Sequence, residues 1–355
     1  MDPPRPPPHA PRSLLGLTND ELGTWAEARG LPAFRGRQLG EALWRQGASS
    51  AAQIKGWPKN LAAGLDGEGP LLPAVEDRRQ EAGDGTIKTL LKLHDGKLVE
   101  CVSIPTATRH TVCVSSQVGC PVGCTFCASG LNGVERDLTA GEIAYQVLHH
   151  HRVRPVTNVV FMGSGEPLFN YANLIQAIRV LADPDGLGLG RRRFTVSTSG
   201  VATRIRQLAV DEPQVTLALS IHAADDETRS RIVPLNRRWP LAELMAAMDD
   251  YSNLVNRRMT LEYVLLADAN MTAGHAHDLA KLALRYGAHI NLIPFNPVVD
   301  TPHRRPTTAE VKGFAAAVAS FGGHATVRGQ RGADIDAACG QLRRRAEASA
   351  KTPVP

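Results

Sequence analysis

From residue 111 onward, short apolar runs typical of buried strands alternate with segments whose apolar residues recur at helical spacing. A strand followed by a helix, repeated six times, predicts parallel strands joined by right-handed crossovers. Because a full barrel of this kind needs eight units, we expect an α/β fold with an open, partial (β/α)6 barrel. A doubly wound sheet is the alternative. The predicted strands are 111–116, 157–163, 193–198, 215–222, 259–266 and 289–294, with 324–329 as a further candidate, and the predicted helices are 139–152, 171–182, 201–209, 240–255, 273–287 and 307–321.

Two other regions precede the barrel core, which we place at 106–346. Residues 13–66 contain short segments with helical spacing and helix start and stop signals, so they predict a small helical accessory domain. Residues 75–105 contain two β-rich runs on either side of Asp95-Gly96, which predicts a β-hairpin extension.

One carboxylate in this hairpin is out of place. The strand period of two puts Glu100 on the same face as the apolar Val102 and Ile104. Burying an unpaired charge is costly, so either Glu100 has a special role or it lies at a sheet edge and reaches water. Its neighbour Cys101 points to the opposite face, and we expect it to be structural.

The composition limits the fold class and the cellular location that we expect for the chain. Its 355 residues are 43% hydrophobic, which is enough for a sizeable core. No apolar run approaches the roughly 20 residues of a membrane helix. The proline-rich stretch 1–12 lacks the apolar centre of a signal peptide, so we interpret it as a disordered tail, with a second tail at 347–355. We expect a cytoplasmic protein without membrane contact, in which cysteines are more often ligands or catalysts than disulfide partners.

The charge pattern favours an anionic partner. The formal net charge is +5, and many of the arginines are clustered. Solvated helix ends and loops are the alternative for any single cluster, but several clusters on one chain favour RNA or DNA. The clusters are 191–193, 237–238, 304–305 and 343–345.

The segments that carry chemistry follow the predicted strands. In parallel α/β folds, sites are built at the carboxyl ends of the strands, so these segments are expected to share one site. They are 120–127 after the first strand, 163–167 after the second, 197–200 at the third, 220–222 at the fourth and 294–297 after the sixth.

Three cysteines, Cys120, Cys124 and Cys127, are spaced C-x3-C-x2-C in the first of these loops. Iron–sulfur clusters are usually held by four thiolates, so three leave one iron open to a substrate. This loop, after the first strand of such a barrel, resembles the radical S-adenosylmethionine (SAM) superfamily. The resemblance implies a [4Fe–4S] cluster whose open iron chelates SAM. A zinc site completed by Cys113 or a histidine is the alternative.

The remaining strand ends suit SAM. Glycines in GSGEP allow close backbone approach, the adjoining glutamate supplies a carboxylate, and small polar groups suit ribose hydroxyls or the methionyl group. For the histidine, a structural role is the alternative. The predicted cofactor-binding residues are Gly165, Glu166, Ser197, Ser220, Ile221, His222 and Asn296.

The resemblance narrows when five motifs are taken together. VCVSSQVGC, GEPL, STSGV, NLIPFNP and RGADIDAACGQL are similar to those of the RlmN/Cfr family of RNA adenosine methyltransferases, from about residue 14 to 345. Two further cysteines, Cys113 and Cys339, match as well. The chain departs from the family pattern at Ser164, where GMGEP is expected, at Phe295, and in RGADID. These departures keep the reactive residues and leave the substrate open.

This resemblance implies roles for three residues. Cys339 receives a methyl group from one SAM, and a radical made from a second SAM activates it to add to adenine. Glu100 accepts the ring proton. Cys113 then attacks the Cys339 sulfur, which releases the methylated base and leaves a disulfide.

The resemblance also implies the target. We expect methylation at adenine C2 of 23S ribosomal RNA, with adenosine 37 of transfer RNA as a further target, an external electron donor, a disulfide reductant and a monomeric enzyme. Methylation at C8, a non-methylating RNA-binding iron–sulfur protein, and a radical SAM enzyme acting on another substrate are the alternatives.

Overall fold

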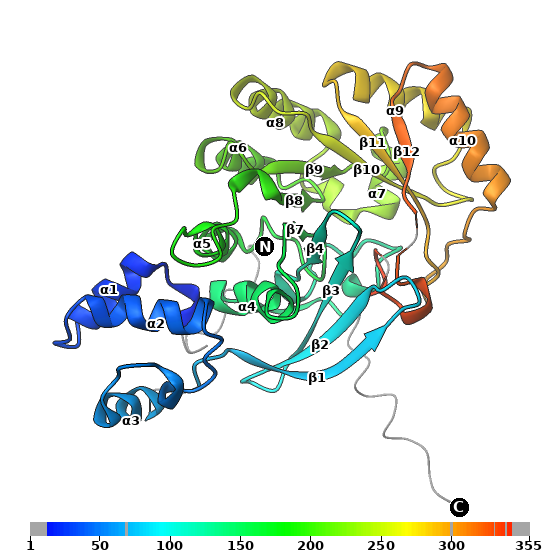
Figure 1. Cartoon of the computed structure of the whole chain (residues 1–355). Helices are drawn as coiled ribbons and strands as arrows, with labels where there is room; N and C mark the ends of the chain where they lie inside the picture. Colours follow the sequence, from blue (N-terminus) through cyan, green and yellow to red (C-terminus); the bar gives the residue numbers. More distant parts are fainter. Residues whose placement is uncertain (1–12, 68–69, 299–300, 330, 338, 343–355) are drawn as a thin grey trace, which may run out of the picture.

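The computed structural model describes residues 13–67, 70–298, 301–329, 331–337 and 339–342. Figure 1 shows a curved sheet with helices along its outer side and a helical region next to it. The predicted tails at 1–12 and 347–355 lie outside the described residues.

One sheet of ten strands organises the molecule. Its order is β1-β2-β3-β4-β7-β8-β9-β10-β11-β12. The strands from β4 to β12 pair in parallel, and β1 to β4 pair antiparallel. The bounds are β1 Ala74–Glu81, β2 Ile87–Leu93, β3 Leu98–Pro105, β4 His110–Cys113, β7 Asn158–Phe161, β8 Phe194–Thr198, β9 Thr216–Ser220, β10 Thr260–Leu265, β11 His289–Pro294 and β12 Ala325–Val327.

The strand order decides between the two predicted architectures. The parallel strands follow one another in chain order without a reversal, whereas a doubly wound sheet reverses direction at a switch point. The predicted partial barrel is therefore confirmed. The candidate last strand is present as β12, which extends the parallel part beyond β11.

The helices of the barrel follow the predicted segments closely. Their bounds are α4 Ala140–His151, α5 Tyr171–Ala182, α6 Ala202–Asp211, α7 Asp226–Ile232, α8 Leu241–Leu254, α9 Ala273–Arg285 and α10 Thr308–Ser320. Reciprocal capping boxes open α4 at Thr139 and α10 at Thr307, each with a glutamate three residues later. Helix α7 was not predicted, because its seven residues are mostly polar and too few to show a period.

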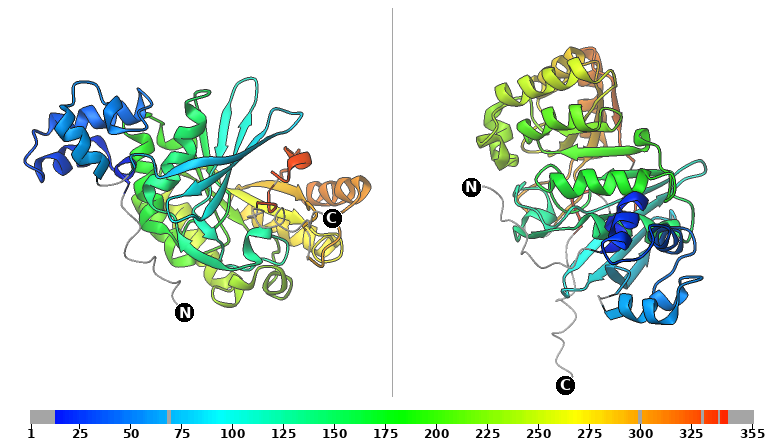
Figure 2. Two further views of the ribbon diagram at one scale, coloured as in Figure 1. Left: turned by 90° about the horizontal axis from the view of Figure 1, so that it is seen from below. Right: turned by 90° about the vertical axis from the view of Figure 1, so that its left-hand side faces the viewer.

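The N-terminal helices share a core with the barrel. They are α1 Asn19–Glu27, α2 Phe34–Trp44 and α3 Lys59–Gly67. Helices α1 and α2 lie beside α4 and α5, and α3 lies farther out (Figures 1 and 2). Leu15, Leu22 and Leu43 are fully buried in the same apolar cluster as the barrel helices. The backbone N–H of Asn19 also donates to the Asp183 carboxylate at 2.7 Å. These contacts fix the helical region against the outside of the barrel.

The predicted hairpin is present as β2 and β3, with Gly96 in the left-handed region at its turn. It belongs to the main sheet, because β3 also pairs with β4. Glu100 therefore does not lie at a sheet edge, and the edge alternative is wrong. Strand β1 was not predicted, because all its residues after Ala74 are exposed and most are charged or polar. Charged residues are typical of edge strands, which they protect from further pairing.

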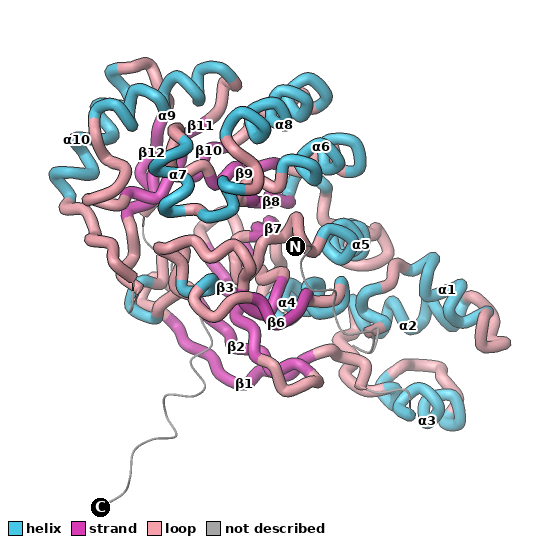
Figure 3. The backbone as a smooth tube through the Cα atoms, turned by 180° about the vertical axis from the view of Figure 1, so that it is seen from behind, coloured by secondary structure: helices cyan, strands magenta, loops and turns pink. Residues whose placement is uncertain are grey.

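A small second sheet lies outside this order. Strands β5 Gln117–Gly119 and β6 Val134–Asp137 pair antiparallel and enclose the loop with the three clustered cysteines. Figure 3 shows β6 beside α4. Arg136 of β6 makes two hydrogen bonds of 2.8 Å to Glu142 of α4 and one of 2.7 Å to Asp95 at the hairpin turn. No helix among the described residues is long and apolar enough to cross a membrane.

Candidate active site

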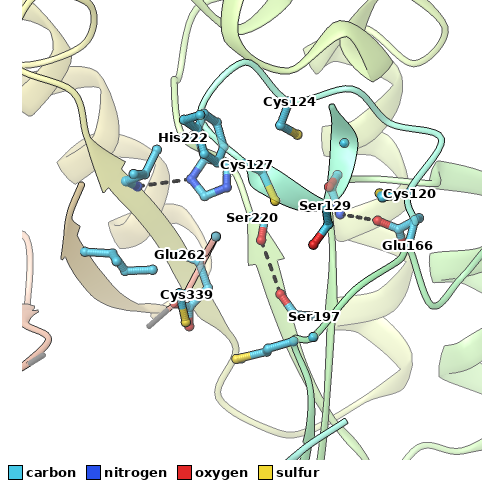
Figure 4. A pocket seen from close by; sticks show the side chains of 18 of the residues that line it. Cys120, Cys124, Cys127, Ser129, Glu166, Ser197, Ser220, His222, Glu262 and Cys339 are labelled. Atoms are coloured by element: carbon cyan, nitrogen blue, oxygen red, sulfur yellow. Dashed lines mark hydrogen bonds between the residues drawn. The ribbon is translucent and has the colours of Figure 1, made fainter. Parts of the chain in front are cut away.

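The main cavity lies at the carboxyl ends of the parallel strands (Figure 4). The space between its lining residues, including the part that is open to solvent, is about 940 Å³. Most of the predicted site residues line it, drawn from loops far apart in the sequence. They are Cys120, Cys124, Cys127, Gly165, Glu166, Ser197, Ser220, His222, Asn296 and Cys339.

The cluster loop, residues 120–133, is built on apolar packing. Val122, Phe126 and Ala128 are buried in an apolar cluster to which residues after β9, β10 and β11 also contribute, and the three cysteines pack against it. The backbone closes on itself, with Cys120 N donating to Gly133 O at 3.0 Å. Thr125 N donates to Ile232 O of α7 at 3.1 Å. The loop thus presents three half-buried thiols at one end of the cavity.

The electrostatics of these thiols fit an iron–sulfur cluster. Burial raises the pKa of Cys120, Cys124 and Cys127, and the charge of neighbouring thiolates raises it further for Cys120 and Cys124. Three crowded thiolates need positive partners, which cluster iron supplies. Among the described residues, no three His, Cys, Asp or Glu side chains are grouped around a single metal position. The three thiols would be the protein ligands of an iron–sulfur cluster, which would supply one-electron chemistry at this end of the cavity.

The GSGEP loop packs closely against the segment that leads into the cluster loop. Gly165 has φ +105°, and a Cβ there would lie 2.7 Å from Gln117 Cβ and Ser116 Oγ. Gly165 is therefore needed for close packing against Ser116 and Gln117 of the chain itself. Glu166 is buried, and its carboxylate accepts from Ser199 N at 2.7 Å and from Leu168 N at 3.1 Å. Burial raises the pKa of Glu166, whereas these hydrogen bonds lower it.

The third and fourth strand ends meet across the cavity floor. The hydroxyls of Ser197 and Ser220 lie 3.2 Å apart, and both face the cavity. His222 adopts φ 56° and accepts from Val264 N at 3.0 Å through Nδ1. Burial lowers its pKa to about 3, so the ring is neutral and carries its proton on Nε2. His222 can therefore donate one hydrogen bond to a polar ligand.

Ile221 differs from its neighbours, because its side chain is fully buried in the core and does not line the cavity. Its carbonyl accepts from Nε of the buried Arg229 at 3.1 Å. The same guanidinium donates to Ser199 O at 2.6 Å. Arg229, which the sequence did not single out, therefore ties the third and fourth strand ends together behind the cavity.

Cys339 lies on a segment without a long helix or strand, here called the C-terminal strap and described at 331–337 and 339–342. Neighbouring loops hold it through hydrogen bonds. Asn296 Nδ2 donates to Cys339 O at 3.3 Å, Ala128 N to Gly340 O at 2.8 Å, and Ser129 Oγ to Leu342 O at 2.9 Å. The strap is thereby fixed directly to the cluster loop.

Cys113 reaches Cys339 through a second cavity, which both residues line together with Val102, Ile104 and Asn296. Cys339 also lines the main cavity, so it lies between the cluster loop and Cys113. Both cysteines are free thiols in this structure. Burial raises the pKa of Cys113 to about 12, with the charge of Cys339 as a further cause.

Arg328 and Glu262 are two charged residues that line the main cavity and that sequence reasoning missed. Arg328 lines both cavities, and the charge of Cys339, followed by those of Glu262 and Cys113, raises its pKa. Glu262 is buried in β10 and accepts from Asn291 at 2.8 Å. A carboxylate within an apolar strand was the available signal for Glu262, as it was for Glu100.

Glu100 lines a third cavity, with Ser129, Ser164 and Leu342. Ser129 also lines the main cavity, and Leu342 the second, so the three spaces adjoin. Glu100 is 7% exposed, and one carboxylate oxygen lies 3.4 Å from Lys88 Nζ. Ser164, the departure from the expected methionine, faces this cavity and donates to Gly119 O at 3.3 Å.

Cys101 takes no part in this site. It is fully buried in the main core, and its sulfur lies 3.4 Å from His150 Nε2. Burial raises its pKa strongly. The structural role expected from the strand alternation agrees with these contacts.

The fold and the cysteine loop define a radical SAM domain, and the sequence model of the Radical SAM superfamily matches residues 114–279. A "probable dual-specificity RNA methyltransferase RlmN" of Desulfitobacterium hafniense (strain Y51) is 46% identical, covering 94% of this chain and 97% of the relative. One of Trichodesmium erythraeum is 44% identical, covering 93% and 95%. A crystal structure of a radical SAM methyltransferase from Sphaerobacter thermophilus matches with a TM-score of 0.90 and 44% identity, over 94% of this chain and 99% of that one.

The chain therefore belongs to the RlmN/Cfr family of radical SAM RNA methyltransferases. A [4Fe–4S] cluster and SAM are the cofactors of this family. The three thiols of the cluster loop and the polar floor of the main cavity fit that pair.

Proposed function

We propose that the protein methylates C2 of an adenosine in 23S ribosomal RNA and, as a second substrate, adenosine 37 of transfer RNA. The relatives' printed name, dual-specificity RNA methyltransferase, supports RNA as the substrate class. The observation that carries the proposal is the place of Cys339, which faces the main cavity on one side and Cys113 on the other.

The reaction needs this arrangement because of the target atom. The C2 carbon of adenine is electron-poor and cannot displace a methyl group from SAM as a nucleophile, whereas a carbon radical can add to it. When bound, the cluster and SAM supply the methyl group and the one-electron chemistry. Cys339 supplies the thiolate that accepts the methyl group. The hydrogen bond from Asn296 to its backbone carbonyl holds it at the cavity.

Two other residues complete the cycle. Glu100 accepts the proton from the ring carbon, a role that suits a buried carboxylate beside the strap. The Cys113 thiolate then attacks the sulfur of Cys339, and the methylated base leaves and takes up a proton. The product is a Cys113–Cys339 disulfide, which an external dithiol reduces. An external electron donor, a monomeric state and a cytoplasmic location complete the proposal.

The RNA must present an unstacked adenine, since the target edge is unreachable inside a helix. Exposed arginines of the predicted clusters supply phosphate contacts. Among the described residues these are Arg192, Arg193, Arg237, Arg238, Arg304 and Arg305. Arg191 is already paired with Glu212 at 3.0 Å, and Arg304 with Glu310 at 2.8 Å. The cluster at 343–345 lies outside the described residues.

Mass spectrometry of the anaerobically purified protein tests the proposal, with the wild type beside Cys113→Ala. We expect a methyl group on Cys339 of the wild type and covalently bound RNA on the variant. Digestion of product RNA then separates 2-methyladenosine from 8-methyladenosine. An unmodified Cys339 and no bound RNA, despite a full cluster, would refute the mechanism and favour a non-methylating RNA-binding protein.

A further inference from the structure

Lys88 is a buried cation beside the residue that we assign as the base. It lies on β2, on the face of the sheet that carries Glu100 of β3, since Leu90 pairs opposite Glu100 and Lys88 opposite Val102. Lys88 is 9% exposed, and its Nζ lies 3.4 Å from Glu100 Oε1. A buried lysine is uncommon unless it is paired, so this ion pair calls for an explanation.

The same ammonium group also reaches the C-terminal strap. Lys88 Nζ donates to the carbonyl of Asp336 at 3.3 Å, three residues before Cys339. Asp336 adopts φ 53°, a left-handed conformation that is uncommon for a residue with a side chain. One cation therefore joins the carboxylate of β3 to the strap that carries the methylated cysteine.

Lys88 places a positive charge beside Glu100. Among the described residues that line the third cavity, Glu100 is the only titratable one. On the opposite face of β3, Cys101 is a neutral thiol, because burial raises its pKa. Burial alone favours the protonated carboxyl, which cannot accept a proton, and a cation a few ångströms away favours the ionised form.

We propose that Lys88 is a positioning residue that keeps Glu100 ionised and aligned with Cys339 for removal of the proton from the target base. The inference rests on the proposed function, in which Glu100 is the proton acceptor. In that step the C–H electron pair stays on the adenine ring and the proton ends on Glu100.

A purely mechanical role, in which Lys88 only pins the strap, is the competing explanation. Three substitutions separate the two. Lys88→Arg keeps the charge, Lys88→Gln keeps a donor for the Asp336 carbonyl without the charge, and Lys88→Met removes both. Lys92→Met is the matched control, because Lys92 is an exposed lysine of the same strand.

The experiment measures methylation by the reconstituted enzyme across pH, with RNA whose target adenine carries hydrogen or deuterium at C2. We expect Lys88→Gln and Lys88→Met to lower the rate about 10- to 100-fold, less than the full loss of a general base. Without the cation a higher pH is needed to ionise Glu100. The acid limb of the pH–rate profile should therefore move to higher pH by about one to two units. The deuterium isotope effect should grow, and Lys88→Arg should restore most of the rate.

Two results would overturn the inference. One is a Lys88→Gln enzyme with the rate, acid limb and isotope effect of Lys92→Met. The other is an equal loss in all three Lys88 variants at every pH without a larger isotope effect, which shows a mechanical role. If Lys88→Met fails to fold, as a melting curve would reveal, the Gln and Arg variants carry the comparison. A Glu100→Gln enzyme with full activity would refute the proposed base itself, and the inference with it.

Discussion

The cluster loop and the C-terminal strap meet at the main cavity, yet they are held there in different ways. Apolar side chains and close backbone hydrogen bonds anchor the cluster loop between β5 and β6. The strap is attached by hydrogen bonds to Ala128, Ser129, Asn296 and Lys88, and by a smaller apolar cluster in which Ala337 and Leu342 pack with Val102 and Cys113. The cluster loop, which carries the three thiols, therefore has the larger apolar anchor. Cys339, to which we assign the methyl group, lies on the segment with the smaller one.

Removing a thiol from the cluster loop should have the largest effect on methylation. We expect Cys124→Ala to lose the cluster and all methylation, because a [4Fe–4S] cluster held by three thiolates cannot spare one. Iron content and visible absorbance of the anaerobically reconstituted protein measure this. Cys101→Ala is the control, a buried cysteine outside the site, and it should keep its iron. Full iron in Cys124→Ala would contradict the assignment.

Removing the thiol from the strap should leave the cluster loop and its cofactor binding intact. We expect Cys339→Ala to bind iron and SAM normally and to form no methylated RNA, because the strap contributes none of the three cluster thiols. Iron analysis, SAM binding and RNA digestion on one preparation check this. Methylation by Cys339→Ala at a tenth of the wild-type rate or more would show that the methyl group does not travel through the strap.

The packed parts of the molecule are also the parts that the sequence predicts best. The helices α4, α5, α6, α8, α9 and α10 and the parallel strands occur within a few residues of their predicted bounds. Long apolar periods and capping residues such as Thr139 specify them locally. Strand β1 and helix α7 were missed because one is a charged edge strand and the other is a short polar turn of helix. Their formation depends on neighbours that no local pattern reveals.

The candidate site shows the same division. Residues at or just after strand ends, such as Glu166, Ser197 and Ser220, could be predicted because parallel strands end at one edge of the sheet. Ile221 was grouped with them, but its side chain turns into the core. Lys88 could not be found from sequence, since its meaning arises only where β2, β3 and the strap meet. Sequence patterns report the secondary structure that carries a residue, and tertiary contacts decide its chemistry.

The rate of product release should depend on pH through Cys113, which lines the second cavity together with Cys339 of the strap. Burial raises its pKa to about 12, so the thiol is protonated at neutral pH and its thiolate fraction rises about tenfold per pH unit below that value. We expect release of methylated RNA from the preformed adduct to accelerate about tenfold between pH 7 and pH 8. Rapid quenching after a pH jump measures the rate. A rate independent of pH would mean that the thiolate is already formed in the adduct.

The smallest expected effect concerns the outer end of the strap. Arg331 lies 3.6 Å from Asp84 at the turn between β1 and β2, and both side chains are partly exposed. Asp84→Asn removes this charge pair and keeps a side-chain oxygen for Thr86 N, which Asp84 now holds at 3.0 Å. Exposed ion pairs contribute about 0–1 kcal/mol, so methylation should fall less than about fivefold.

High salt should abolish the difference in methylation between Asp84→Asn and the wild type, because screening weakens exposed ion pairs. Asp250→Asn is the matched control, since Asp250 pairs with Arg206 at 2.5 Å on the outer helices α8 and α6, away from the strap. It should leave methylation unchanged at every salt concentration. If Asp84→Asn instead lowers methylation more than about tenfold and high salt does not restore it, the strap depends on the hairpin as a packed element. The strap and the cluster loop would then be held alike, contrary to the comparison.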